Sequence, residues 1–109
     1  MADFPESDWR VLRSVHDEAL ERYCTRVLDD VVQIARGEGT AHERYLRVFR
    51  AVDDHNDRIA HAFDDMRRSR AIQRLAAMMN LDVVTDEELA RFSKPAREMA
   101  LGLVELFRK

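Results

Sequence analysis

The chain has 109 residues, of which 46% are hydrophobic and 36% are charged, and its formal net charge at pH 7 is −3. This length suits one domain with a single hydrophobic core, and the hydrophobic fraction excludes a chain that is disordered throughout. The slightly acidic balance does not favour nucleic acid as a partner. We therefore expect a single domain over residues 1–109.

Three further features bear on where the protein acts. The one cysteine, Cys24, excludes a disulfide within the chain and a cysteine-based zinc site. No apolar run approaches the roughly 20 residues of a membrane-spanning helix, so a membrane is not an expected partner. Residues 1–6 lack the basic start and the apolar stretch of a signal peptide. The sequence therefore predicts a cytoplasmic protein.

The sequence contains few helix-breaking residues (3 Gly and 2 Pro) and many charged ones. This composition predicts an all-α fold with long helices whose outer faces are solvated. Apolar residues recur every three or four positions from Trp9 to Ala35, which predicts a first helix over about 8–36. Gly37 is well placed to end it, because glycine adopts the left-handed conformation without a steric penalty.

The second predicted helix begins after a tight turn at 37–39. Thr40 and Glu43 have the spacing of a capping box, and no Gly or Pro interrupts the following stretch, so we expect this helix over about 41–79. A short connection makes the two helices antiparallel neighbours. The sequence therefore predicts a long antiparallel helical hairpin.

A stripe on the second helix, with alternating spacings of four and three residues, is the predicted seam of this hairpin. In the predicted pairing, the first helix meets this stripe at several layers. The pairs are Val31 with Tyr45, Val27 with Phe49, Cys24 with Val52, and Leu20 with Asn56. Beyond Met66 the spacing changes, and the segment 67–79 is predicted to overhang the hairpin. It then needs a cover, either from the same chain or from a second copy.

Two shorter helices are predicted after the hairpin. Thr85 and Glu88 form a second capping box that opens a helix over about 86–92. Pro95 fits the first turn of a last helix over about 95–108. We expect this pair to pack on the segment 67–79. The remaining apolar surface favours burial in a homodimer, which makes the predicted architecture a dimeric helical bundle.

Asn56 is the one polar residue within the predicted seam. A lone amide in such a stripe often sets the register or the oligomeric state, and His16 is a reasonable partner for it. The alternative is that Asn56 occupies a half-exposed position at the edge of the seam. We therefore treat Asn56 and His16 as a candidate register-setting polar core.

A basic cluster in the segment 67–79 is the candidate partner-binding site. It suits a phosphate or an acidic protein, and the alternative is an exposed helix face whose charges are balanced by nearby acidic residues. The cluster consists of Arg67, Arg68, Arg70 and Arg74.

Asp57, His61 and Asp65 stand four residues apart, so in one helix they would form a stripe of metal-ligating types. Imidazole and carboxylates suit zinc, iron or manganese. However, metal sites in helical bundles use inward-facing carboxylates from several helices, and the first helix offers few. Surface ion pairs are the favoured interpretation, and no cofactor is expected.

The segment 85–93 also has some features of a helix-turn-helix, because a Thr-capped helix contains Glu-Leu-Ala. The turn that should follow it, with Gly and an apolar residue, is replaced by Ser93, Lys94 and Pro95. No catalytic order of Ser, His and Asp and no Gly-rich phosphate loop is present, so we expect no enzymatic activity. The leading hypothesis is a homodimeric protein-interaction or adaptor module. The alternatives are a nucleic-acid-binding regulator that uses the C-terminal helices and a metal-binding helical bundle.

Overall fold

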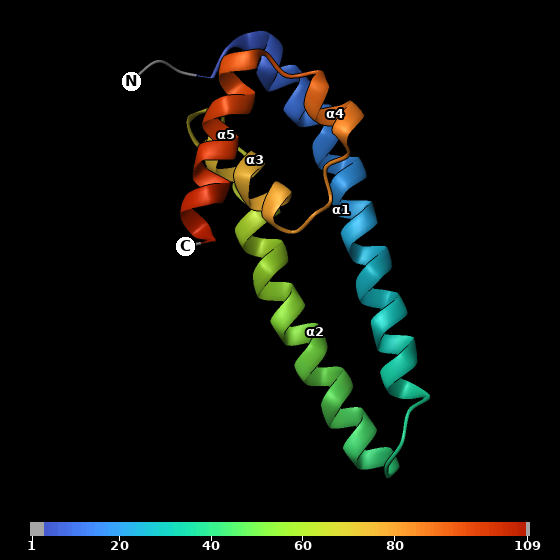
Figure 1. Cartoon of the computed structure of the whole chain (residues 1–109). Helices are drawn as coiled ribbons and strands as arrows, with labels where there is room; N and C mark the ends of the chain where they lie inside the picture. Colours follow the sequence, from blue (N-terminus) through green and yellow to red (C-terminus); the bar gives the residue numbers. More distant parts are fainter. Residues whose placement is uncertain (1–3, 109) are drawn as a thin grey trace.

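A computed structural model describes residues 4–108, and in this part of the chain every regular element is helical (Figure 1). The predicted all-α fold is confirmed. Between residues 4 and 108, no helix is both long and apolar enough to cross a lipid bilayer. The elements are α1 (Glu6–Ala35), α2 (Ala41–Phe63), the 3-10 turn η1 (Arg68–Arg70), α3 (Ala71–Asn80), α4 (Asp86–Ala90) and α5 (Lys94–Phe107).

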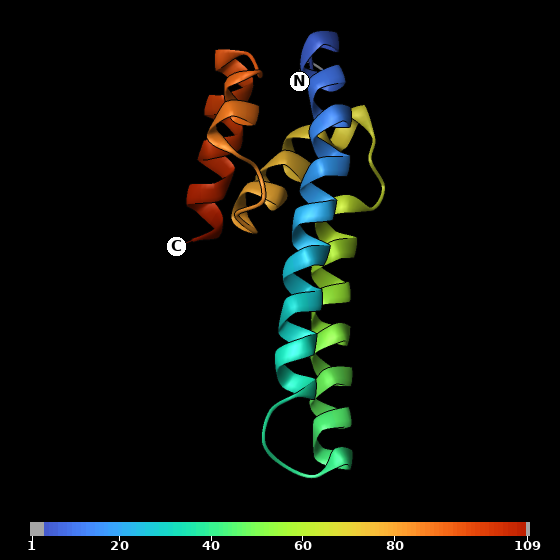
Figure 2. The same ribbon diagram turned by 90° about the vertical axis from the view of Figure 1, so that its right-hand side faces the viewer.

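The two longest helices, α1 and α2, lie side by side in opposite directions and confirm the predicted hairpin (Figures 1 and 2). Gly39 in the connecting turn has a φ of 106°, which glycine adopts without strain. Thr40 accepts the Glu43 backbone N–H, and the Glu43 carboxylate accepts the Thr40 N–H, both at 3.1 Å. The predicted capping box therefore does start α2.

The prediction of one continuous helix over 41–79 is wrong, because α2 ends at Phe63 and α3 begins at Ala71. Asp65 between them has a φ of 55°, a left-handed conformation that ends a right-handed helix. Aspartate tolerates this conformation better than most residues, and two carboxylates at a helix C-terminus also oppose the helix dipole. The pair Asp64 and Asp65 therefore favours an end to the helix here.

Arg74 of α3 stabilises this break. Its guanidinium donates hydrogen bonds to the carbonyl oxygens of Asp64 at 2.8 Å and His61 at 3.0 Å. These bonds replace those that a continuing helix would have given to the last turn of α2. The chain then turns back, and α3 packs on α5, α2 and α1. The segment that was predicted to overhang is therefore covered within the chain.

The predicted seam of the hairpin is also wrong. Tyr45, Phe49 and Val52 are exposed, so pairs such as Val31 with Tyr45 do not form the interior. The apolar arc of α2 is wide, and its other edge faces α1, where His55 contacts Tyr23. The half-buried positions of α2 include Val48, Ala51, His55 and Ile59.

The hydrophobic core lies at the base of the hairpin, where the N-terminal half of α1 meets the C-terminal helices (Figure 1). The two short predicted helices are confirmed, with ends that differ by one or two residues. The fully buried large side chains at this base include Leu12, Val15, Leu75, Met78, Val83 and Phe92.

Buried polar contacts attach α4 and α5 to α1. Asp8 accepts the backbone N–H and the hydroxyl of Ser93, each at 2.7 Å, directly before α5. Further along α1, Arg22 donates two hydrogen bonds to the Glu88 carboxylate and one to the carbonyl oxygen of Val83. These contacts fix the C-terminal helices on one side of the hairpin and leave its far half uncovered by them (Figure 2).

Candidate functional site

Five large apolar side chains are exposed on the half of the hairpin that lies away from the core. They come from both helices, and we call them the distal face. Their exposed fractions are 64% for Leu28, 45% for Val32, 64% for Tyr45, 59% for Phe49 and 46% for Val52.

The two halves of the distal face lie on the same side of the hairpin. On α1, Leu28 is rotated by about 140° from Tyr23, which points at α2. On α2, Phe49 is rotated by about 120° in the same sense from His55, which points at α1. Because the helices are antiparallel, equal rotations in the same sense bring both stripes to one side. Leu28 therefore lies on the same side as Tyr45, Phe49 and Val52, and Val32, rotated by about 180° from Tyr23, borders them on the outer side of α1.

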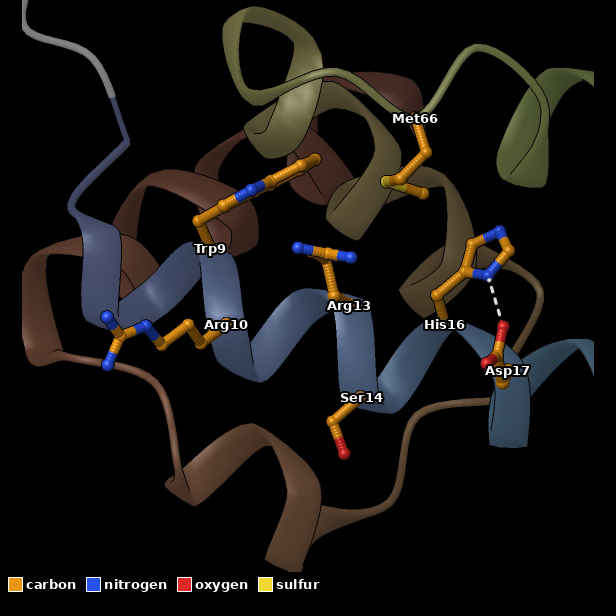
Figure 3. A pocket seen from close by; sticks show the side chains of 7 residues that line it. All are labelled: Trp9, Arg10, Arg13, Ser14, His16, Asp17 and Met66. Atoms are coloured by element: carbon orange, nitrogen blue, oxygen red, sulfur yellow. Dashed lines mark hydrogen bonds and ion pairs between the residues drawn. The ribbon is translucent and has the colours of Figure 1, made fainter.

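A hollow of about 520 Å³ lies at the base of the hairpin, along the N-terminal half of α1. Figure 3 shows the side chains of Trp9, Arg13 and Met66, which line it, close together on one side of α1. His16 has both ring nitrogens engaged, with Nδ1 at 3.0 Å from the Asp17 carboxylate and Nε2 at 3.0 Å from the carbonyl oxygen of Phe63. The hollow therefore provides an apolar contact surface with a guanidinium in it.

A second concavity, of about 890 Å³, runs between α3 and α5. Its lining is largely apolar, and Gly102 in the middle of α5 contributes to it. Apart from its chain neighbours and the surrounding backbone of α5, no described atom lies within 4 Å of where a Cβ on Gly102 would be. This α3–α5 groove is therefore open above the α5 backbone. Its apolar lining residues include Ile72, Pro95, Met99, Leu103 and Leu106.

The predicted basic cluster is divided by the structure. Arg74 is largely buried and holds the end of α2, while Arg68 donates to the Phe4 carbonyl oxygen at 2.6 Å and to Glu6 at 2.8 Å. Arg67 and Arg70 stay exposed, and both pair with Asp65. A continuous helix over 41–79 would have placed Arg67, Arg70 and Arg74 on one face, but α2 ends at Phe63, so these residues do not share a helix face. Arg68 also lines the α3–α5 groove.

The structure does not bring Asn56 and His16 together. Asn56 is exposed at the base end of the distal face, whereas His16 contacts Phe63. A polar contact between α1 and α2 is made instead by the hydrogen bond between the Tyr23 hydroxyl and Nδ1 of His55, at 2.7 Å. Any role of Asn56 in setting register therefore concerns a second chain.

The three residues of the metal hypothesis are separated as well. Asp57 and His61 lie exposed on α2, but Asp65 lies beyond its end, where it pairs with arginines. Across residues 4–108, no group of three or more His, Cys, Asp or Glu side chains is placed to hold a metal ion.

The basic residues of the helix-turn-helix hypothesis are partly engaged in the fold. Arg97 donates to the Phe92 carbonyl oxygen at 2.5 Å, and Lys94 lies 3.9 Å from Glu98. This leaves few free cations on α5 for a phosphate backbone.

Glu88 on α4 is a carboxylate with a strongly lowered pKa. Hydrogen bonds from Arg22 lower the pKa of Glu88 from its ordinary value of 4.5 to about 2, against the opposing effect of burial. A further hydrogen bond from the Thr85 backbone N–H lowers this pKa as well. Glu88 is therefore an ionised structural group whose bonding capacity is taken up by the fold.

Comparisons with known proteins add no relative: no protein-family model matches the chain, and neither the curated proteins nor the solved structures provide a match. The distal face and the α3–α5 groove are therefore the features from which a function must be argued.

Proposed function

We propose that the protein is a non-enzymatic interaction module that acts as a homodimer, with two hairpins packed through their distal faces into a four-helix bundle. The observation that carries this proposal is the distal face itself. Two antiparallel helices with apolar stripes on one side are half of such a bundle, and a second copy supplies the other half.

The size of the distal face supports a specific interface. From the exposed fractions of its five side chains, each copy offers roughly 500 Å² of apolar surface. A single apolar patch of this size on a soluble chain is often functional. Two copies bury about 1,000 Å² from these residues alone, which reaches the range of specific protein interfaces before flanking residues are added.

A dimer through the distal face leaves the α3–α5 groove of each copy open to solvent. This supports an adaptor role, in which self-association and the contact with another protein use different surfaces. The alternatives have less support, because the nucleic-acid hypothesis has few free cations on α5 and the metal hypothesis loses Asp65 from its stripe.

Light scattering and sedimentation equilibrium of Phe49→Glu test the proposal. We expect the wild type to be a dimer at micromolar concentration and Phe49→Glu to be a monomer with the same helical circular dichroism, because a carboxylate cannot be buried unpaired at the interface. Leu101→Glu is the matched control, since Leu101 is similarly exposed but lies on α5. A wild type that stays monomeric at high micromolar concentration contradicts the proposal.

A further inference from the structure

We infer that the α3–α5 groove binds an amphipathic helix of another protein, which lies antiparallel to α5 and places a carboxylate against Arg68. This inference rests on the adaptor role in the proposed function and names the chemistry of the partner. The occupant is a helix of about three turns with one apolar stripe. Figure 2 shows α5 beside the hairpin, and the residues that line the groove are separate from those of the distal face.

The apolar stripe of α5 along the groove has a spacing that a helical partner matches. Pro95, Met99, Gly102 and Leu106 line the groove at intervals of three and four residues. The stripe extends for about 16 Å, which corresponds to three helical turns. Met99 is 47% exposed and Leu106 is 65% exposed. A partner helix of this length would remove both side chains from water.

Gly102, in the middle of this stripe, is a residue that the fold itself does not require. It lies inside α5 and has no positive φ, and at such a position glycine is less stable than alanine. Apart from its chain neighbours and the nearby α5 backbone, no described atom lies within 4 Å of a Cβ placed there. Glycine suits a position where another backbone approaches closely. We therefore place the partner helix directly over Gly102.

The two ends of the groove differ in charge. Among the described residues that line it, Arg68 is the only charged one. Arg68 donates to the carbonyl oxygen of Phe4, and the Phe4 ring contacts Phe92, shortly before α5 begins. At the other end, Asn80 and Phe107, the last residues of α3 and α5, line one small hollow. Arg68 and the positive ends of both helix dipoles therefore lie at the same end of the groove.

This charge distribution determines the direction of the partner helix. A helix is negative at its C-terminus, so the antiparallel orientation places the negative end of the partner at Arg68. Within residues 4–108, Arg68 donates hydrogen bonds through Nε and Nη1, and 41% of its side chain is exposed, so Nη2 is available to a carboxylate of the partner. Glu6, which pairs with Arg68, also lies 3.5 Å from Arg10. One carboxylate thus serves two guanidinium groups at this end of the groove.

Fluorescence anisotropy with two model peptides tests the charge contact. Both peptides are amphipathic helices of about 15 residues with Leu every three or four positions, and they differ only in the last turn, which carries Glu or Lys. We expect the Glu peptide to bind the wild type about fivefold more tightly than the Lys peptide at low salt, and Arg68→Glu to reverse this order. Because the same two peptides meet both proteins, their own helicity cancels.

Arg70→Glu is the matched control for this charge reversal. Arg70 is exposed near Arg68 but does not line the groove, so this variant should keep the wild-type order of the two peptides. Circular dichroism checks that each variant is folded. If a folded Arg68→Glu protein keeps the wild-type order as well, Arg68 does not meet the carboxylate and the inference is wrong.

Two substitutions on α5 test whether the peptide lies in the groove. Met99→Glu should weaken binding of the Glu peptide at least about tenfold, because a carboxylate would be buried under the helix. Leu101→Glu is the matched control, since Leu101 is 46% exposed but does not line the groove. Gly102→Gln should also weaken binding, although glutamine favours the helix, so unfolding cannot be the cause. Unchanged binding to Met99→Glu and Gly102→Gln would overturn the inference.

The same titration with Phe49→Glu separates this inference from the proposed dimer. We expect Phe49→Glu, as a monomer, to bind the Glu peptide as tightly as the wild type does, because Phe49 lies on the distal face. A wild type that binds the peptide but does not dimerise overturns the dimer and leaves the groove standing. A wild type that dimerises but binds neither peptide at high micromolar concentration overturns the groove and leaves the dimer standing.

Discussion

The guanidinium of Arg22 on α1 donates two hydrogen bonds, of 2.7 and 2.8 Å, to the carboxylate of Glu88 on α4. One oxygen of this carboxylate also accepts the backbone N–H of Thr85 at 2.9 Å. A single side chain thus caps a short helix and attaches it to the long helix. Because Glu88 has only 3% of its side chain exposed, its charge depends on these donors.

This contact predicts a loss of stability in acid. The pKa of Glu88 is lowered from 4.5 to about 2 in the folded state, chiefly by the Arg22 hydrogen bonds. A lowered folded-state pKa means that the stabilisation is complete above pH 4.5 and is lost as the pH falls toward 2. We expect the free energy of unfolding, measured by urea denaturation, to fall across this window.

Glu88→Gln is the variant that isolates this effect. It should lower the free energy of unfolding at pH 7 by about 3 kcal/mol, because Arg22 loses its buried charged partner and keeps only the exposed Glu18, 3.6 Å away. It should also make the decline between pH 4.5 and 2 shallower than in the wild type. Glu87→Gln, at the exposed neighbouring position, is the control. An equally steep decline in Glu88→Gln and the wild type contradicts the assignment.

The contact between Asp8 and Ser93 predicts a second stability effect. Asp8 is almost completely buried, and it accepts both donors of Ser93. Asp8→Ala leaves these donors without an acceptor, which should cost about 2 kcal/mol in the free energy of unfolding. Ser14→Ala, at an exposed position of α1, should change it by less than about 0.5 kcal/mol. Equal stabilities of the two variants would mean that this contact contributes nothing.

The hydroxyl of Tyr23 predicts a smaller effect inside the hairpin. Tyr23→Phe removes its hydrogen bond to His55 and leaves a part-buried imidazole nitrogen without this partner. We expect a loss of about 1 kcal/mol in the free energy of unfolding. Tyr45→Phe is the natural control, because Tyr45 is exposed on the distal face. Thermal and urea melts at low protein concentration measure both, and a Tyr23→Phe protein as stable as Tyr45→Phe would refute the prediction.

Replacing Gly102 is predicted to increase the stability of the protein. Glycine within a helix costs roughly 1 kcal/mol relative to alanine, and a Cβ at Gly102 meets no described atom within 4 Å beyond its chain neighbours and the nearby α5 backbone. Gly102→Ala should therefore raise the free energy of unfolding by about 1 kcal/mol. Gly39→Ala should lower it, because Gly39 has a φ of 106°. Denaturation that ranks the two variants in the opposite order would contradict both arguments.

Local sequence signals predicted the starts of α2 and α4 correctly. Thr40 and Thr85 each open a helix through a capping box, because the reciprocal hydrogen bonds need only four consecutive residues. The end of α2 was not predicted, since the left-handed conformation of Asp65 is stabilised by Arg74, which binds from another helix. Such a tertiary contact leaves no periodic signal in the sequence.

The predicted seam of the hairpin was wrong for a related reason. The stripe through Tyr45 and Phe49 was identified correctly as apolar, but periodicity states only that one side of a helix avoids water. It does not state whether that side faces α1 or a second chain. The pair Tyr23 and His55 was missed, because an aromatic hydroxyl and an imidazole that meet across two helices have no characteristic spacing.

The candidate site was predicted only in outline. The homodimer hypothesis came from the amount of apolar surface, and the exposed distal face now gives it a location. The arginines at 67, 68, 70 and 74 were predicted to bind a partner because of their charge density. Arg68 and Arg74 instead donate hydrogen bonds to backbone carbonyl oxygens of the same chain. Charge density in a sequence does not distinguish a binding cluster from a set of structural donors.

The break between α2 and α3 also determines which parts of the molecule open locally. By turning α3 back onto the base, it concentrates tertiary contacts there and leaves the tip of the hairpin with few neighbours beyond its own two helices. Backbone amides near Gly37 should therefore exchange with solvent through local opening, whereas those around Leu12 and Leu75 should exchange only through global unfolding. Association through the distal face would protect the tip and leave the base unchanged. Amide exchange followed as a function of protein concentration would then reveal the dimer as a slowing confined to one end of the hairpin.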